Sequence, residues 1–258
     1  MSLDTPAGAP AESAAVHAQA APAAAPAHDG TVHMILWTMC LAHFLNDLLQ
    51  ALIPAVLPIL KEAYKLDFGQ VGIIAAAFMI SASIFQPVVG MITDKKTYPY
   101  ALPLGMCATM VGLLMFAGAG TYVMLLLAAV LVGFGSAIFH PEGARVARMA
   151  AGGRHGMAQS TFQVGGNFGQ ASGPLMTAFV IVPLGQAGLG WFGILAFATV
   201  VLLFFVSRWV SAQMQDQVQR KRAAVTDLNP LGLTNKKLIT IICVLLLLTF
   251  SKSFYTAS

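Results

Sequence analysis

The sequence predicts an all-α membrane protein, in which a bundle of six apolar helices is followed by a linker and the start of a second bundle. Hydrophobic residues make up 57% of the 258 residues and charged residues only 9%, whereas soluble domains are about one quarter charged. Apolar stretches of about 20 residues, the length that crosses a bilayer, recur along the chain. This composition excludes a soluble enzyme and, for most of the length, a disordered chain.

The first 33 residues depart from this average. Residues 1–33 are rich in Ala and Pro and contain no Lys or Arg. A secretory signal would begin with basic residues and continue as an unbroken apolar core. We therefore expect a disordered tail on the cytosolic side.

The transmembrane region is expected over residues 34–207. Its six predicted helices are the apolar segments near residues 34–60, 68–92, 100–119, 121–147, 157–182 and 188–207. A basic cytosolic linker is expected over 208–237 and a seventh span over 238–258. Six spans, a linker and one further span suggest two bundles of six, so we expect the second bundle to be truncated in this sequence.

The distribution of Lys and Arg predicts a cytosolic N-terminus, because short cytosolic loops are enriched in these residues. In this orientation only Lys61 and Lys65 lie on the outer side. Eleven cations lie on the cytosolic side: Lys95, Lys96, Arg145, Arg148, Arg154, Arg208, Arg220, Lys221, Arg222, Lys236 and Lys237. The net charge of +4 then reflects contact with anionic lipid, and we expect no nucleic-acid partner. The expected location is the bacterial cytoplasmic membrane.

Polar residues inside the first predicted span indicate a cavity. His43, Asp47, Gln50 and Pro54 recur at helical spacing, with Asn46 beside them, so they share one helix face. Ionisable groups in lipid cost about 2.5–3.5 kcal/mol or more, so each suggests a functional site. A buried hydrogen-bond cluster between helices is the structural alternative.

The fourth predicted span carries a second polar group in the sequence IFHPEGAR. Glu142 and Arg145 are three residues apart and are able to pair, and His140 precedes them. We keep two interpretations open: an ion pair at the membrane interface, with Arg145 extending to the headgroups, or a gate or a proton or substrate site. The first and fourth spans thus each carry a histidine and a carboxylate, which weakly supports two inverted three-helix repeats.

Two stripes run along the fifth predicted span. The amides Gln159, Gln163, Asn167 and Gln170 form one stripe, and Gly165, Gly169 and Gly173 form the other. The offset of two residues places them on nearly opposite helix faces. We expect the glycines to pack closely against another helix and Gln163 and Asn167 to line a polar path.

Two kinds of residue remain inside apolar segments. Lys252 in the seventh span requires a counter-ion or a wet cavity, and Asp47 and Glu142 are both candidates. The three cysteines, Cys40, Cys107 and Cys243, have neither metal-ligand nor disulfide spacing, so we interpret them as core residues. The sequence indicates no cofactor and no metal site.

Short motifs resemble those of the major facilitator superfamily. GMITD with the following lysines, that is Gly90, Asp94 and Lys95, resembles its loop signature after the second span, although the later Gly-Arg-Lys portion is absent. The resemblance implies that Asp94 steadies the cytosolic gate; a solvated acid at a helix end is the alternative.

The fifth and fourth spans carry two further partial matches. GQASGP, with Gly169, Gly173 and Pro174, resembles the signature of the superfamily's antiporters. The fourth-span signature is matched by Gly133, Gly135 and Ala137. Its usual arginine position is occupied by Ala129, so this chain lacks the usual proton-transfer arginine there.

Longer stretches resemble one group within this superfamily, the bacterial fosmidomycin-resistance proteins. They include LAHFLNDLLQALIPAVLPILK and FHPEGARVARMAAGGRHGMAQSTFQVGGNFG, and the resemblance covers residues 36–258. It implies a twelve-helix exporter of an anionic phosphonate antibiotic in exchange for protons. This chain would be the N-terminal half and the seventh helix.

The resemblance gives the polar residues roles. Candidates for proton coupling are Asp47, Glu142, His43 and His140. Candidates for the substrate path are Asn46, Gln50, Arg145, Gln163, Asn167 and Lys252. Three alternatives remain: a major facilitator transporter of another metabolite, a non-transporting scaffold or sensor, and a membrane enzyme. The last lacks any HExxH motif or pairing of nucleophile and base. The oligomeric state is left open.

Overall fold

The computed structural model describes residues 30–95, 98–221, 237, 239–241, 243–244 and 247. Residues 1–29, residues 222–236 and most of the predicted seventh span, including Lys252, lie outside the described residues, as does Lys96. The chain divides into two units, residues 1–210 and residues 211–258. All statements on packing below concern the first unit.

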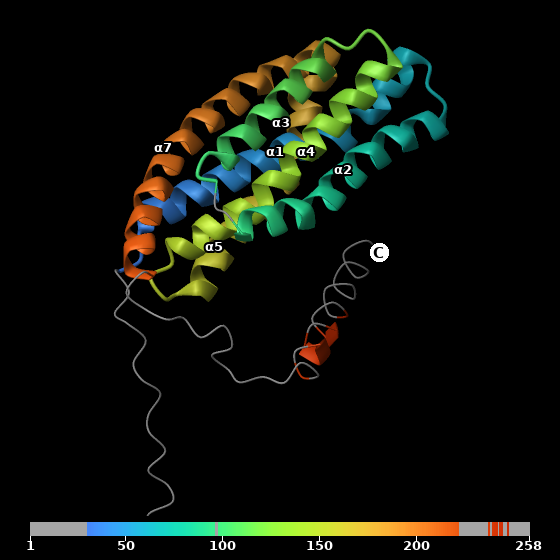
Figure 1. Ribbon diagram of the computed structural model, residues 1–258. Helices are drawn as coiled ribbons and strands as arrows, with labels where there is room; N and C mark the ends of the chain where they lie inside the picture. The colour runs from blue at the N-terminus through green and yellow to red at the C-terminus, as the bar shows by residue number, and fades with distance from the viewer. Residues whose placement is uncertain are drawn as a thin grey trace, which may run out of the picture. The chain divides into compact units, whose positions relative to one another are not determined.

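The described residues are helical and form no strand, which confirms the predicted all-α fold class (Figure 1). The long helices are α1 (His33–Tyr64), α2 (Phe68–Lys95), α3 (Ala101–Ala117), α4 (Tyr122–Met149), α5 (His155–Met176) and α7 (Leu189–Lys221). After α5 the chain continues helically through a π-helix, η1 (Thr177–Ile181), and the short α6 (Val182–Leu184). A turn at Gly185 and a 3₁₀ turn, η2 (Gln186–Gly188), then lead into α7.

Four described helices are long and apolar enough to cross a membrane: α1, α2, α4 and the helical segment Gln186–Met214. The helix α3 is apolar but shorter, with 17 residues. The helix α5 has a lower hydropathy because glycines and amides replace large apolar residues along it.

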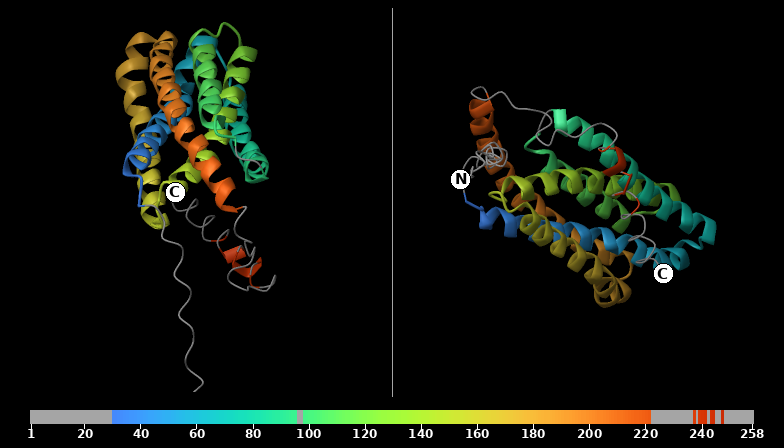
Figure 2. Two further views of the ribbon diagram at one scale, coloured as in Figure 1. Left: turned by 60° about the vertical axis from the view of Figure 1, so that its left-hand side comes forward. Right: turned by 90° about the horizontal axis from the view of Figure 1, so that it is seen from below.

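The packing follows a two-fold pattern. The main partner of α1 is α5, and the main partners of α4 are α2 and α3; α1 and α4 also touch each other. Exchanging α1 with α4 and α2 with α5 converts the α1–α5 pair into the α4–α2 pair. Figure 2 shows α5 lying alongside α1. This arrangement fits the predicted inverted three-helix repeats.

Glycines set the close approach of α5 to α1. A Cβ atom at Gly165 would lie 2.1 Å from the carbonyl oxygen of Cys40, and one at Gly169 would lie 2.3 Å from that of Phe44. At Gly173 the nearest atom would be the Cβ of Ala51, at 2.3 Å. The predicted glycine stripe therefore packs against α1, and only hydrogen at these positions lets the two backbones meet.

Glycines also allow α4 to pack closely against two neighbouring helices. A Cβ at Gly133 would lie 2.0 Å from the hydroxyl of Ser81 on α2, and one at Gly135 would lie 2.2 Å from that of Thr109 on α3. The side chain of Ala129, at the position of the missing arginine, is fully buried. The centre of α4 is thus tightly packed against α2 and α3. This packing limits how far α4, with its polar residues, can slide along these two helices.

Candidate functional site

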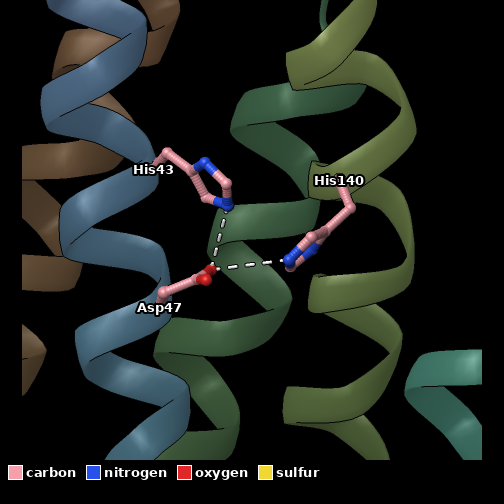
Figure 3. A group of neighbouring side chains, drawn as sticks. All are labelled: His43, Asp47 and His140. Atoms are coloured by element: carbon pink, nitrogen blue, oxygen red, sulfur yellow. Dashed lines mark ion pairs between the residues drawn. The ribbon is translucent and has the colours of Figure 1, made fainter. Parts of the chain in front are cut away.

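The centre of the site is a cluster of three side chains on α1 and α4. Figure 3 shows the imidazoles of His43 and His140 pointing toward the carboxylate of Asp47. The Nε2 atom of His43 lies 3.4 Å from Asp47 Oδ1, and that of His140 lies 3.5 Å from the same oxygen. The sequence placed His43 and Asp47 on one face; the structure adds His140 from across the α1–α4 contact.

Burial makes this cluster electrostatically strong. The exposed fractions of His43 and Asp47 are 1% and 3%, whereas the His140 side chain is 30% exposed. The ring of His43 stacks on Phe162 of α5 with centroids 3.9 Å apart. Charges in such a position interact through a low effective dielectric constant. An ionised Asp47 therefore requires a cation or strong hydrogen-bond donors near it.

Neutral donors supply part of this support. The buried amide of Asn46 donates to Asp47 Oδ1 at 2.9 Å, and the amide of Gln170 lies 3.5 Å from Oδ2. Asn46, a predicted substrate-path residue, is fully buried and thus contacts the carboxylate rather than the cavity. Gln170 belongs to the amide stripe of α5 but was not among the predicted site residues.

A cavity of about 880 Å³ lies beside the cluster. Its polar lining residues include Gln50 and His140, which were predicted, and Ser136, Gln86 and Gln170, which were not. Its apolar wall includes Pro54, Ala55, Phe78, Met79, Ala82, Pro174 and Val182. None of the described lining residues is a lysine or an arginine. The volume is within the range of pockets for drug-sized ligands.

Hydrogen bonds connect the lining to the cluster. The hydroxyl of Ser136 donates to Gln50 Oε1 at 2.7 Å. This bond leaves Gln50 Nε2 as a buried donor without a hydrogen-bond partner among the described residues. Ser136 precedes His140 by one helical turn, and that spacing was the available sequence signal for it. A donor left free at a cavity wall is suited to an oxygen atom of a ligand.

The second polar group lies at the α2–α4 contact, at the end of α2. Arg145 Nη2 pairs with the Asp94 carboxylate and also donates to Thr93 Oγ1 at 3.1 Å. Its Nη1 donates to the backbone carbonyl of Thr93 and lies 3.7 Å from Glu142 Oε1. Glu142 is 2% exposed, and its Oε1 has no hydrogen-bond partner among the described residues. Arg145 does not line the cavity, and Thr93 had not been predicted.

The remaining predicted residues are placed as follows. Gln163 and Asn167 are exposed on α5 and form a mutual contact of 3.4 Å, outside the cavity lining. Gly90 has open space around it, and Lys95 ends α2. Gly169 and Gly173 pack on α1, and Pro174 lines the cavity.

Comparisons with known proteins agree with this architecture. Residues 39–258 match the family model of the Major Facilitator Superfamily. The chain belongs to this superfamily. It is therefore a multi-pass membrane protein of a transporter family and not an enzyme.

Two curated relatives share the same percentage of identical residues with the chain over their aligned regions. The fosmidomycin resistance protein of Escherichia coli (strain K12) is 48% identical over 224 residues, which cover 87% of this chain and 54% of that protein. The uncharacterized MFS-type transporter YfnC of Bacillus subtilis (strain 168) is 48% identical over 190 residues, covering 74% of this chain and 46% of that protein. The chain thus spans about half the length of the curated relatives it matches.

A solved structure supports the fold alone. The crystal structure of tetrameric PepTSo2 matches with a TM-score of 0.54 at 15% sequence identity, over 87% of this chain and 48% of that one. The predicted major facilitator fold is confirmed by the family match and by this likeness.

Proposed function

We propose that the transporter to which this chain belongs exports small anionic antibiotics of the fosmidomycin type from the bacterial cytoplasm in exchange for protons. The observation that carries the proposal is the 880 Å³ cavity, whose apolar wall bears a few converging polar groups beside a buried carboxylate. Such a cavity is typical of small-molecule sites. The similarity to the Escherichia coli protein, named for fosmidomycin resistance, suggests the substrate class.

Recognition of the anion is proposed to use neutral donors. The Gln50 amide, a buried donor without a partner among the described residues, would turn toward the cavity that it borders and donate to a phosphonate oxygen, with His140 on the same wall. Arg145 is engaged by Asp94 and Thr93 outside the cavity, so we assign it to the cytosolic gate rather than to the substrate. The predicted role of Asp94 in steadying that gate fits this pair.

Proton exchange is proposed to use one of the two buried carboxylates, Asp47 or Glu142. Both side chains are almost fully buried. The Glu142 carboxylate lies 3.7 Å from Arg145 Nη1, and the Asp47 carboxylate lies beside the two histidines; a buried charge that loses such a partner is costly. A carboxylate in this setting therefore favours either a bound proton or a bound cation. Alternating access would follow from rocking of the two halves about a site between them.

The first experiment measures fosmidomycin susceptibility in an efflux-depleted bacterium. The strains express this chain, a version extended to the relatives' full length, and the extended Asp47→Asn and Asp67→Asn forms. Asp67 is the matched control, because it is an exposed acid that caps the start of α2 through Gln70, and asparagine keeps that cap. We expect the extended wild type and the Asp67→Asn form to protect, and the Asp47→Asn form to fail.

Proton movement is measured in everted membrane vesicles with a pH-sensitive dye. Addition of fosmidomycin should release protons from an acidified lumen only when the extended protein is present. If that protein inserts in the membrane but changes neither susceptibility nor proton movement, the substrate assignment is wrong. Another anionic metabolite would then be sought, as the 48% identity to the uncharacterized YfnC permits.

A further inference from the structure

Three lone pairs meet at one buried point in the cluster of His43, Asp47 and His140. The Nδ1 atom of His43 lies 2.7 Å from the backbone carbonyl oxygen of Phe162, and that of His140 lies 3.0 Å from the carbonyl of Ser136. A carbonyl oxygen only accepts hydrogen bonds, so both Nδ1 atoms carry the hydrogen. In the neutral rings both Nε2 atoms then present lone pairs to the carboxylate.

Acceptors facing acceptors repel one another unless a positive species lies between them. His43 Nε2 has no hydrogen-bond partner among the described residues and is fully buried. A buried acceptor without a partner is costly. The cluster therefore requires a cation at the point where the Nε2 atoms and the carboxylate converge.

Two of the three separations match those of ligands around a transition metal. Zn–N and Zn–O bonds of about 2.0–2.2 Å in a tetrahedron place neighbouring ligand atoms about 3.3–3.5 Å apart. The two observed Nε2–Oδ1 distances are 3.4 and 3.5 Å. All three ligand atoms lie within 4.8 Å of one another, and the half-buried ring of His140 is the one with room to close the third side.

The surroundings supply what metal ligands usually have. Metal-binding histidines donate their second N–H to a carbonyl or carboxylate, which fixes the ring and its tautomer. Both histidines do so here, and the amide of Asn46 orients the carboxylate. Gly166 leaves the space open, since a Cβ there would lie 2.5 Å from His43 Nε2 and 2.9 Å from Asp47 Oδ2.

We propose that His43 Nε2, His140 Nε2 and the Asp47 carboxylate bind a divalent first-row transition-metal ion, with Zn²⁺ as the representative. Two imidazoles and one carboxylate form a donor set that suits such ions. Three protein ligands leave a coordination position open. His140 borders the cavity, and we assign the open position to that side. The ligand expected there is an oxygen atom of an anionic solute.

The metal would also supply the positive charge that the described cavity lining lacks. This second step rests on the proposed export of an anion, whereas the metal site itself does not. A metal-bound oxyanion would explain how a lining without lysine or arginine holds a phosphonate. The cluster would then bind the substrate through the ion rather than through direct contact.

The test measures metal binding by the purified protein at its relatives' full length, with any affinity tag removed. The protein is treated with chelator and titrated with Zn²⁺, and bound metal is counted by mass spectrometry. Co²⁺ is then added, because its visible absorption bands report a tetrahedral nitrogen and oxygen environment. We expect about one ion per chain. Loss of even a supporting hydrogen bond weakens metal sites about 10–100-fold, so Asp47→Asn and His140→Gln should weaken binding at least that much.

Two further variants separate ligand loss from misfolding. Gly166→Ala keeps all three ligands but places a methyl group against two of them, and it should weaken binding by a similar factor. His155→Ala removes an exposed histidine at the start of α5 and should bind as the wild type does. Each variant is required to elute as a single species in size-exclusion chromatography.

The inference is overturned if the wild type binds no stoichiometric Zn²⁺ or Co²⁺, or if the Asp47→Asn and His155→Ala forms bind equally. The first result would mean that protons alone fill the cluster. Because no drug is used, this outcome is independent of the export assay. Stoichiometric metal binding without fosmidomycin export would keep the site and refute the proposed substrate.

Discussion

Substitution of Gly165 by alanine tests whether the glycine stripe holds α5 against α1. The added methyl carbon would lie 2.1 Å from the carbonyl oxygen of Cys40 and 2.9 Å from its carbonyl carbon. These are backbone atoms, so no side chain can rotate away, and the two helices must separate. Gly156 is the matched control, because it lies in the same helix and a Cβ there would meet nothing within 4 Å.

The two substitutions are expected to change the free energy of unfolding in opposite directions. Replacing glycine with alanine inside a helix stabilises it by about 1 kcal/mol. Gly156 lies in the first turn of α5, so Gly156→Ala should gain at most about that much. Overpacking costs about 1–3 kcal/mol, and the backbone contact at Gly165 places that variant at the upper end. The net loss for Gly165→Ala is therefore about 2 kcal/mol. In a protein of the relatives' full length this corresponds to a fall in Tm of about 2–4 °C, because the shift per kcal/mol decreases as the chain grows.

Thermal unfolding in detergent, followed by size-exclusion chromatography of heated samples, measures the difference. Both variants are made in the protein at its relatives' full length and compared with the wild type in the same detergent. A Gly165→Ala protein as stable as Gly156→Ala would refute the reasoning, because it would show that α5 and α1 do not approach as closely as the structure indicates.

Three other outcomes follow from the structure. Arg145→Ala should lower resistance to anionic and neutral drugs by the same factor, since Arg145 ties α4 to the end of α2 and does not line the cavity; a selective loss for the anion, measured by susceptibility, would restore a substrate role. Gly185→Ala should lower Tm, because φ is +66° and ψ is −163° at this position, a region that costs other residues about 1–3 kcal/mol; an unchanged Tm would contradict that conformation. A cysteine placed at Asp67 should react with an impermeant thiol reagent in intact cells and one placed at Arg154 should not, if the N-terminus is cytosolic; the reverse pattern would invert the proposed topology.

Much of the fold was predictable because its signals are local. Apolar runs of the right length and the joints between them predicted the six long helices, α1 to α5 and α7. The spacing of Gly165, Gly169 and Gly173 predicted a close helix contact, and the structure shows that contact with α1. The shared face of His43, Asp47 and Gln50 followed in the same way from helical periodicity.

The site was predictable only in part, because periodicity gives the face of a helix but not the partner of that face. The sequence left open whether Arg145 pairs with Glu142 or serves the substrate; the structure places Asp94 and Thr93 of another helix around it. Gly166 and Ser136 were not recognised, since neither carries a charge and Gly166 lies outside the regular stripe. Their roles depend on what lies opposite them.

The sequence by itself determined that this is an all-helical membrane protein with polar residues on defined helix faces, since composition and spacing along one helix are sufficient for that. Tertiary structure decided which faces meet. The helices α1 and α4 contact each other, and their register along that contact brings His140 within 3.5 Å of Asp47. A chemical site made by two helices depends on this register, which arises only when the helices pack.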